Sequence, residues 1–213
     1  MNADILPPYS LRTAVRHLKR ADPTLATMIT AVGPCHLRLR PQIHPFEALL
    51  RAIVYQQLSG KAASTIYGRF AALFPSVHGI IPERLLEFPD ESLRAVGLSR
   101  NKVLAVRDLA QKTLEGVVPG PGGLDELSDD EIVARLTAVR GIGRWTVEML
   151  LIFTLGRPDI LPLDDLGVRK GFRSVYGMKK LPAGSTMIRA GKAWAPYRSV
   201  ASWYLWRVAD ADS

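Results

Sequence analysis

Apolar residues recur every three to four positions through most of this sequence, and that spacing restricts the fold more than any other feature. A helix of 3.6 residues per turn places such residues on one face, where they pack against a core. The clearest example is the face formed by Ala62, Ala63, Ile66, Phe70 and Leu73. Alternation of apolar and polar residues, which indicates a strand, is confined to the short segment 36–40. We therefore expect an all-α fold.

Capping residues and helix breakers divide this pattern into about ten helices. Ser10, Ser99 and Ser128 precede helices as N-caps, and Ser128 forms a capping box with Glu131. The segment 116–127, rich in glycine and proline, is expected to be a surface loop. The expected helices span about 11–20, 23–33, two within 46–74 that meet near 59–60, 82–87, 90–96, 100–114, 129–139, 144–155, 166–176, 185–194 and 196–208.

We expect these helices to form two lobes with a cleft between them, within a single unit that spans residues 1–213. The central lobe is expected to cover about residues 40–140. The second lobe is expected to combine about residues 1–39 with residues 141–213, and the segment 136–147 is placed near the junction.

The chain of 213 residues carries a net charge of +8, with a calculated pI of about 9.9. Such an excess of Lys and Arg favours a polyanionic partner, because binding to phosphates releases counterions. The single cysteine, Cys35, excludes a disulfide framework, a zinc cluster or an iron–sulfur cluster built within this chain. The first residues lack the pattern of a signal peptide, and no apolar run reaches the ~20 residues of a membrane span. We expect a cytoplasmic protein, monomeric and without a membrane partner.

The stretch AVRGIGRWTVEMLLIF, residues 138–153, joins two predicted helices through a short glycine turn. Gly141 is free to adopt a positive φ, and Gly143 allows another backbone to approach closely. The first N–H groups of the second helix point outward, and the helix dipole adds positive potential there. Arg140 and Arg144 flank the turn. This combination binds a phosphate group, although an ordinary glycine cap between two helices would give the same pattern.

At this point the sequence resembles the helix–hairpin–helix DNA glycosylases, and in particular the 3-methyladenine DNA glycosylase II branch. The resemblance rests on L-x-x-V-x-G-I-G-x-W-T from Leu136 and on P-x-D-D, which ends at Asp165. Three further segments occur in the family order: FEALLRAIVYQQLSGKAA, GLSRNKVLAVRDLA and PYRSVASWYLWR. The resemblance covers roughly residues 10–208. It implies an all-α base excision repair enzyme that removes alkylated purines from double-stranded DNA, with nucleoid association if the source is bacterial.

The chain departs from parts of this family. Nothing in it corresponds to the extra N-terminal domain of the longer bacterial members, so it resembles a short form. Endonuclease III-like relatives use four cysteines to hold an iron–sulfur cluster, which one cysteine cannot do. We expect that no cofactor is required. The family hairpin often binds a monovalent cation, Na⁺ or K⁺, through main-chain carbonyl groups, and by position these are Thr137, Val139 and Ile142.

The segment DILPLDDLGVRKGF supplies the candidate catalytic carboxylates. Cleavage of an N-glycosidic bond passes through a sugar with cationic character, which a fixed carboxylate stabilises while it orients or deprotonates water. Asp165 aligns with the family aspartate, twenty residues after Trp145. Asp164 is the alternative, because a shift of one residue in the alignment exchanges the two. Either carboxylate is also suited to cap the helix that follows.

Bifunctional members of the family have a lysine where this chain has Trp145. That lysine attacks the sugar as an amine and forms a Schiff base, which an indole cannot do. The resemblance therefore implies a monofunctional glycosylase that leaves an abasic site and does not cleave the strand.

Further site residues follow from the resemblance and from base flipping, which such chemistry requires in a duplex. Trp145 and Trp206 match aromatic residues of the family's base pocket, with Gln56 and Tyr55 beside them, and aromatic rings attract cationic alkylpurines. Trp203 and Tyr204 are weaker candidates, because the same helix must also contribute to the core. Gln57 takes the position of the wedge that enters the DNA stack, although a polar helix end would also explain it. The DNA backbone contacts expected from the resemblance and from the turns are Ser59, Gly60, Lys61, Gly97, Ser99, Lys102, Arg140, Gly141, Gly143 and Arg144.

Two other functions were compared with this one. A non-catalytic DNA-binding module would use the same hairpin, but it gains nothing from an Asp pair that faces phosphates. A glycosylase of different lesion specificity, such as one for oxidised guanine, is disfavoured by the missing lysine and cysteines. The range of lesions, including hypoxanthine and etheno-adenine, is left open by the sequence.

Overall fold

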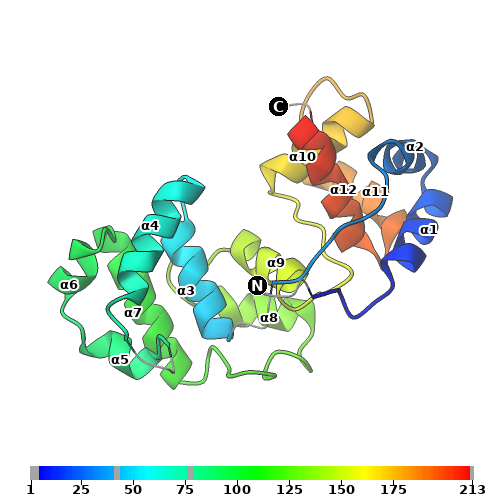
Figure 1. Ribbon diagram of the computed structural model, residues 1–213. Helices are drawn as coiled ribbons and strands as arrows, with labels where there is room; N and C mark the ends of the chain where they lie inside the picture. The colour runs from blue at the N-terminus through cyan, green and yellow to red at the C-terminus, as the bar shows by residue number, and fades with distance from the viewer. Residues whose placement is uncertain (1–4, 41–43, 76–78, 212–213) are drawn as a thin grey trace. The chain divides into compact units, whose positions relative to one another are not determined.

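The computed structural model describes residues 5–40, 44–75 and 79–211. Helices account for nearly all regular structure in them, and an isolated bridge between Ile5 and Leu39 is their one β pairing. The all-α prediction is confirmed. The helices are α1 (Leu11–Ala21), α2 (Pro23–Val32), α3 (Pro45–Tyr55), α4 (Gly60–Ala71), α5 (Pro82–Glu87), α6 (Asp90–Ala95), α7 (Arg100–Leu114), α8 (Asp129–Leu136), α9 (Arg144–Phe153), α10 (Leu166–Val175), α11 (Gly184–Trp194) and α12 (Arg198–Ala211), as drawn in Figure 1.

The chain forms two compact units. Unit 1 contains residues 1–41 and 151–213, and unit 2 contains residues 42–150. The first boundary lies close to the position expected from the sequence. The second lies between Leu150 and Leu151, inside α9, rather than near residue 140. The hairpin therefore belongs wholly to unit 2.

Unit 2 is organised around α7, the longest helix within it. Helices α3, α5 and α6 all pack against α7, and α4 packs against α3 (Figure 1). Ser99 begins α7 by accepting a hydrogen bond from the N–H of Lys102 at its side-chain oxygen. Val103, Val106 and Leu109 lie on its buried face, at the spacing that a core-facing helix requires.

Unit 1 is organised around α12 in the same way. Helices α1, α2, α10 and α11 all contact it, and α10 makes the most extensive contact. The residues from Ser199 to Leu205 are buried without interruption, so this helix is apolar or small on nearly every side. The candidate carboxylates stand at the start of α10, which means that α12 sets their position.

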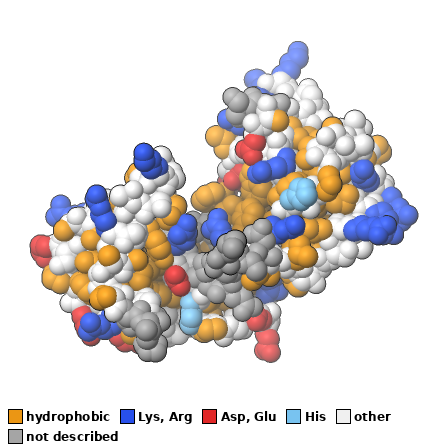
Figure 2. Space-filling view, in the orientation of Figure 1, with side chains coloured by type: hydrophobic (Ala, Val, Ile, Leu, Met, Phe, Trp, Pro, Cys, Tyr) orange, Lys and Arg blue, Asp and Glu red, His pale blue; other side chains and the backbone are white. Residues whose placement is uncertain are grey.

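Basic side chains are spread over both units, and on the face shown in Figure 2 they are more frequent than acidic ones. Among the described residues, no helix is long and apolar enough to cross a membrane. The excess of positive charge belongs to unit 1, because within residues 42–150 the acidic residues slightly outnumber Lys and Arg.

Candidate active site

The carboxylate of Asp165 lies at the N-terminus of α10 and is 9% exposed. Its Oδ1 atom accepts the N–H of Val168 at 2.7 Å, the usual bond of an N-cap, and the indole Nε1–H of Trp206 at 2.8 Å. Asp164, by contrast, is exposed. Asp165 is therefore the cap of α10, and its predicted catalytic role stays a prediction.

Two glycines on α10 allow this geometry. A Cβ atom at Gly171 would lie 1.9 Å from the carbonyl oxygen of Leu205, so the backbones of α10 and α12 touch there. One turn earlier, a Cβ at Gly167 would lie 2.7 Å from Trp206 Cδ1 and 3.1 Å from Asp165 Oδ1. The absence of side chains at both positions brings the indole of Trp206 directly against the carboxylate.

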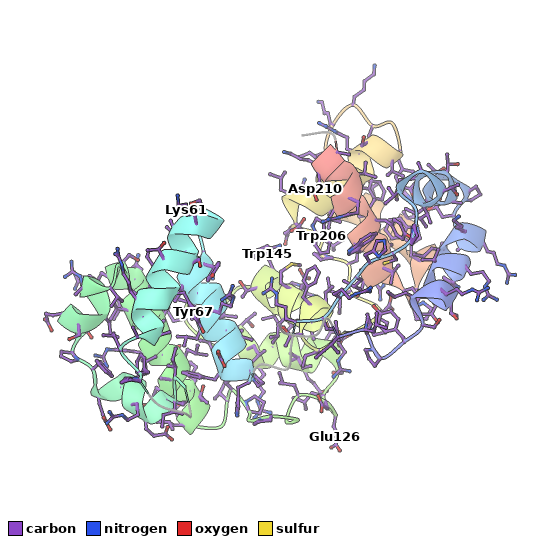
Figure 3. The ribbon with its side chains drawn as sticks, in the orientation of Figure 1. Lys61, Tyr67, Glu126, Trp145, Trp206 and Asp210 are labelled. Atoms are coloured by element: carbon purple, nitrogen blue, oxygen red, sulfur yellow. The ribbon has the colours of Figure 1, made fainter. Side chains whose placement is uncertain are left out.

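The aromatic residues of α12 fall into two groups. Trp206 is partly exposed, and its ring lies 5.4 Å from that of Phe153 at a shallow angle of 33°. Figure 3 labels it on α12. Trp203 and Tyr204 are buried; they meet edge to face at 5.0 Å, and the hydroxyl of Tyr204 donates to the carbonyl of Gly33. These two side chains therefore belong to the core of unit 1, whereas part of the Trp206 side chain is exposed to solvent.

The hairpin of unit 2 has the conformation that its glycines suggest. Gly141 has a φ of 78°, and a Cβ there would lie 3.3 Å from the Cβ of Ala105 on α7. The backbone N–H of Arg140 donates to Asp108 Oδ2 at 2.7 Å. No atom lies within 4 Å of a Cβ built on Gly143, so the backbone there is open to a ligand. The turn is thus fixed from the α7 side and accessible on the other.

The first residues of α9 are exposed beside this turn. Arg144 pairs through Nε with Glu148 at 3.0 Å, and its side chain is still 60% exposed. Trp145 is 46% exposed, unusually high for an indole, and Figure 3 labels it at the start of α9. The hairpin therefore presents a cation and a large aromatic ring next to open backbone.

The turn that follows α3 carries the two adjacent glutamines. Gln57 has a φ of 58°, the one left-handed conformation of a residue other than glycine in the described chain. The amide of Gln56 donates from Nε2 to the carbonyl of Gly141 at 2.8 Å. The ammonium of Lys102 donates to the carbonyls of Val54 and Gln56 at 2.7 and 2.8 Å. Lys102, predicted as a phosphate contact, thus already directs two of its three protons to the protein.

Tyr55, predicted beside the base pocket, is half-buried within unit 2. The guanidinium of Arg51 lies 4.3 Å from the centre of its ring, and Tyr67 meets it edge to face at 6.1 Å. Burial raises the pKa of Tyr67 to about 12, and the nearby Glu47 carboxylate adds to this rise. These contacts fix the Tyr55 ring, and its predicted role in the pocket stays a prediction.

The remaining predicted backbone contacts lie at helix starts and turns. Ser59 caps α4 by accepting the N–H of Ala62, and Gly60 and Lys61 form the exposed first turn that Figure 3 labels at Lys61. Gly97, with a φ of 109°, and Ser99 lead into α7. In unit 2 the chain thus presents exposed N-terminal turns of α4 and α7, in addition to the hairpin.

The predicted cation ligands, the carbonyl groups of Thr137, Val139 and Ile142, lie between the end of α8 and the start of α9. The carbonyl of Val139 accepts the N–H of Ile142 at 3.0 Å, and Thr137 forms the C-cap of α8. Among the described residues, no group of three or more His, Cys, Asp or Glu is placed to hold a metal ion. A cation at this turn would accordingly depend on main-chain oxygens.

The model of the HhH-GPD superfamily of base excision DNA repair proteins matches residues 50–196, a span that contains the hairpin, Trp145 and Asp165. The chain belongs to this superfamily. It is 37% identical over 199 residues to DNA-3-methyladenine glycosylase 1 of Schizosaccharomyces pombe, which covers 93% of this chain and 87% of the relative. This similarity places it in the 3-methyladenine DNA glycosylase branch.

Solved structures give the same result. A 3-methyladenine DNA glycosylase from Schizosaccharomyces pombe, in complex with abasic DNA, matches with a TM-score of 0.78 at 36% identity, and covers 92% of this chain and 95% of that one. A DNA-3-methyladenine glycosidase from Bacillus halodurans matches with a TM-score of 0.84 at 36% identity, over 98% and 94% of the two chains. The predicted family and fold are confirmed.

Several residues that shape the site were not identified from the sequence. Asp108 and Ala105 hold the hairpin, and Gly167 and Gly171 bring α10 against α12. A signal was present in both cases: Lys102, Ala105 and Asp108 recur every three residues on one side of α7, and the two glycines are one helical turn apart.

Proposed function

We propose that this protein is a monofunctional DNA glycosylase that excises alkylated purines, such as 3-methyladenine and 7-methylguanine, from duplex DNA. The observation that carries the proposal is the buried carboxylate of Asp165, fixed by Val168 and Trp206, in a chain of this family that also has an open glycine hairpin. A carboxylate adds nothing to DNA binding itself, because it repels phosphates.

In this reaction Asp165 stabilises the positive charge that develops on the sugar as the N-glycosidic bond breaks. The carboxylate also orients or deprotonates the water that attacks the sugar. The hydrogen bonds from Val168 and Trp206 both end on Oδ1 and fix the direction of the carboxylate. Because alkylated purines already carry positive charge and leave readily, moderate catalysis is sufficient and favours them over normal bases.

In unit 2 the hairpin binds a DNA phosphate through its backbone N–H groups, and Arg144 adds a positive charge. Gln57 enters the base stack, and the exposed ring of Trp145 offers a surface for a flat, cationic base. Trp206 offers another such surface in unit 1. A monovalent cation at the carbonyls of Thr137, Val139 and Ile142 would strengthen the phosphate contact, since hard oxygen ligands suit such ions.

The test is release of methylated purines from duplex DNA treated with a methylating agent. The purified protein is incubated with this DNA and with an untreated duplex, and the freed bases are separated by chromatography. The proposal predicts free 3-methyladenine or 7-methylguanine from the treated DNA and no release from the untreated one. Absence of both bases, with DNA binding intact, would instead favour a DNA-binding module without catalysis.

A further inference from the structure

Three residues on one side of α7 contact the two turns of unit 2 that we assign to DNA. Lys102 donates to the carbonyls of Val54 and Gln56, at the end of α3. Asp108 accepts the N–H of Arg140 in the hairpin at 2.7 Å. Between them, Ala105 lies against Gly141, where a Cβ would approach it to 3.3 Å. A spacing of three residues places all three side chains along one edge of the helix.

The turn held by Lys102 needs such support. Gln57 adopts a left-handed conformation with a φ of 58°, which is unfavourable for a residue that has a side chain. Its own side chain is exposed and contributes no packing that would offset this cost. The two hydrogen bonds from the ammonium of Lys102 end on the residues that directly precede Gln57, and charge-assisted bonds of this kind are the stronger ones.

Lys102 is half-buried, and this partial burial lowers the pKa of its ammonium. Lys61, in the neighbouring first turn of α4, is exposed and has no such bond. The two lysines near the turn therefore have different surroundings, and Lys102 is directed inward, toward the main chain.

Gln56 connects the two turns directly. Its carbonyl oxygen accepts from Lys102, while its side-chain amide donates to the carbonyl of Gly141 at 2.8 Å. Gln56 is therefore hydrogen-bonded both to α7 and to the hairpin, whose Gly141 lies 85 positions later in the chain.

We propose that Lys102 and Asp108 are positioning residues that hold the Gln57 turn and the hairpin in one fixed arrangement, with Gln56 as the link between them. Phosphate binding at the hairpin and insertion of Gln57 into the base stack then favour each other. Lys102 affects Gln57 through its hydrogen bonds to the preceding main chain, and it does not contact a phosphate. This inference rests on the proposed DNA-contacting roles of the two turns, and it does not require that a base be excised.

The test uses a duplex that carries a tetrahydrofuran abasic-site analogue opposite 2-aminopurine, whose fluorescence changes when a side chain enters the gap. The dissociation constant and the fluorescence change at saturation are measured separately. The variant Lys102→Met removes the donors and keeps the length of the side chain, and Lys102→Arg retains donors. Lys192→Met, at an exposed position of α11, removes one positive charge from the other unit and serves as the control.

For Lys102→Met we expect the fluorescence change at saturation to fall about fivefold or more, because loss of a charge-assisted bond shifts the turn away from the inserting conformation. The dissociation constant should also rise several-fold above that of the control, because insertion and phosphate binding favour each other. Lys102→Arg should regain at least half of the signal. A normal signal from Lys102→Met would overturn the inference. A loss confined to the dissociation constant would also overturn it, and would show Lys102 to be a phosphate contact.

The link through Gln56 is tested with Asp108→Ala, which removes the acceptor of the Arg140 N–H, combined with Lys102→Met. If the two turns are coupled, the combined loss of signal is smaller than the product of the two single losses. A combined loss equal to that product shows independent turns and refutes the link.

These measurements also separate this inference from the proposed function. A wild-type protein that gives the fluorescence change, with the expected response to Lys102→Met, but releases no methylated base supports the inference and refutes the glycosylase activity. If the wild type releases methylated bases but the Lys102→Met signal is unchanged, the glycosylase activity is supported and the inference about Lys102 is refuted.

Discussion

Trp206 donates the hydrogen of its indole Nε1 to Oδ1 of Asp165, across 2.8 Å, and this bond joins α12 to the first turn of α10. The two residues lie 41 positions apart in the chain. The contact gives the carboxylate a fixed direction, because the same oxygen also accepts the N–H of Val168. A carboxylate held in this way needs little reorganisation when positive charge develops near it.

The variant Trp206→Phe removes the donor and retains an aromatic ring. We expect the rate of base release under single-turnover conditions to fall by roughly 10–100-fold, as for loss of a hydrogen bond to a charged group. Trp203→Phe, on the same helix but away from the carboxylate, is the matched control and should affect stability more than rate. Equal rates for Trp206→Phe and the wild type would mean that the hydrogen bond has no part in catalysis.

Replacement of Gly171 by Ala tests the close approach of α10 and α12. The added Cβ would lie 1.9 Å from the carbonyl oxygen of Leu205, so the two helices must separate. Overpacking of this kind should lower Tm by roughly 5–10 °C. Gly184→Ala, whose Cβ would lie 4.0 Å from its nearest neighbour, should leave Tm almost unchanged, as circular dichroism would show. A similar effect of both changes would contradict the assigned contact.

Asp22 gives a prediction about acid stability. Burial alone would raise the pKa of this carboxyl, but hydrogen bonds from the N–H of Leu25, the hydroxyl of Tyr176 and the indole of Trp194 outweigh it, and the net pKa is lowered. A lowered pKa stabilises the fold above the unfolded value of about 3.9, and this stabilisation disappears as the pH falls through the folded value.

Urea unfolding of the wild type and of Asp22→Asn, compared between about pH 5 and pH 3, measures this contribution. The asparagine keeps an oxygen that can cap α2 but carries no charge. The free energy of unfolding should therefore fall more steeply with acid in the wild type than in the variant. Parallel curves for the two proteins would show that the hydrogen bonds to Asp22 do not depend on its charge.

The position of Trp145 predicts the outcome of a borohydride trap. Reduction captures an enzyme on DNA only when an amine has formed a Schiff base with the sugar. The wild type, which has an indole at the lysine position of the bifunctional relatives, should release a methylated base and leave no covalent complex on a denaturing gel. A trapped complex would show that another amine of the chain attacks the sugar.

Local signals in the sequence were sufficient for most of the fold. The capping box is confirmed: the N–H of Ser128 donates to Glu131, and the N–H of Glu131 donates back to the Ser128 hydroxyl. Ser10 and Ser99 cap α1 and α7 as predicted. Two helix ends were placed too late. Helix α8 ends at Leu136, because the N–H of Val139 turns back to the carbonyl of Leu136, and α9 ends at Phe153.

The site was less accessible from the sequence, because its geometry depends on contacts between distant residues. The resemblance to the family indicated Asp165, with Asp164 as the alternative. In the structure Asp165 is buried and bonded to Trp206, whereas Asp164 is exposed. The bond from Gln56 to Gly141 joins turns that no periodic pattern relates. The side-chain direction of Lys102 could not be foreseen either, since an inward and an outward lysine have the same sequence signature.

The most direct measurement of the central claim is single-turnover release of 7-methylguanine by the wild type, Asp165→Asn and Asp164→Asn. Asparagine retains the ability to cap α10, so both variants should fold and bind the duplex. We expect Asp165→Asn to lose at least about 100-fold in rate, as when a charge-stabilising group is removed, and Asp164→Asn to stay within about threefold of the wild type. An active Asp165→Asn beside an inactive Asp164→Asn would contradict the account.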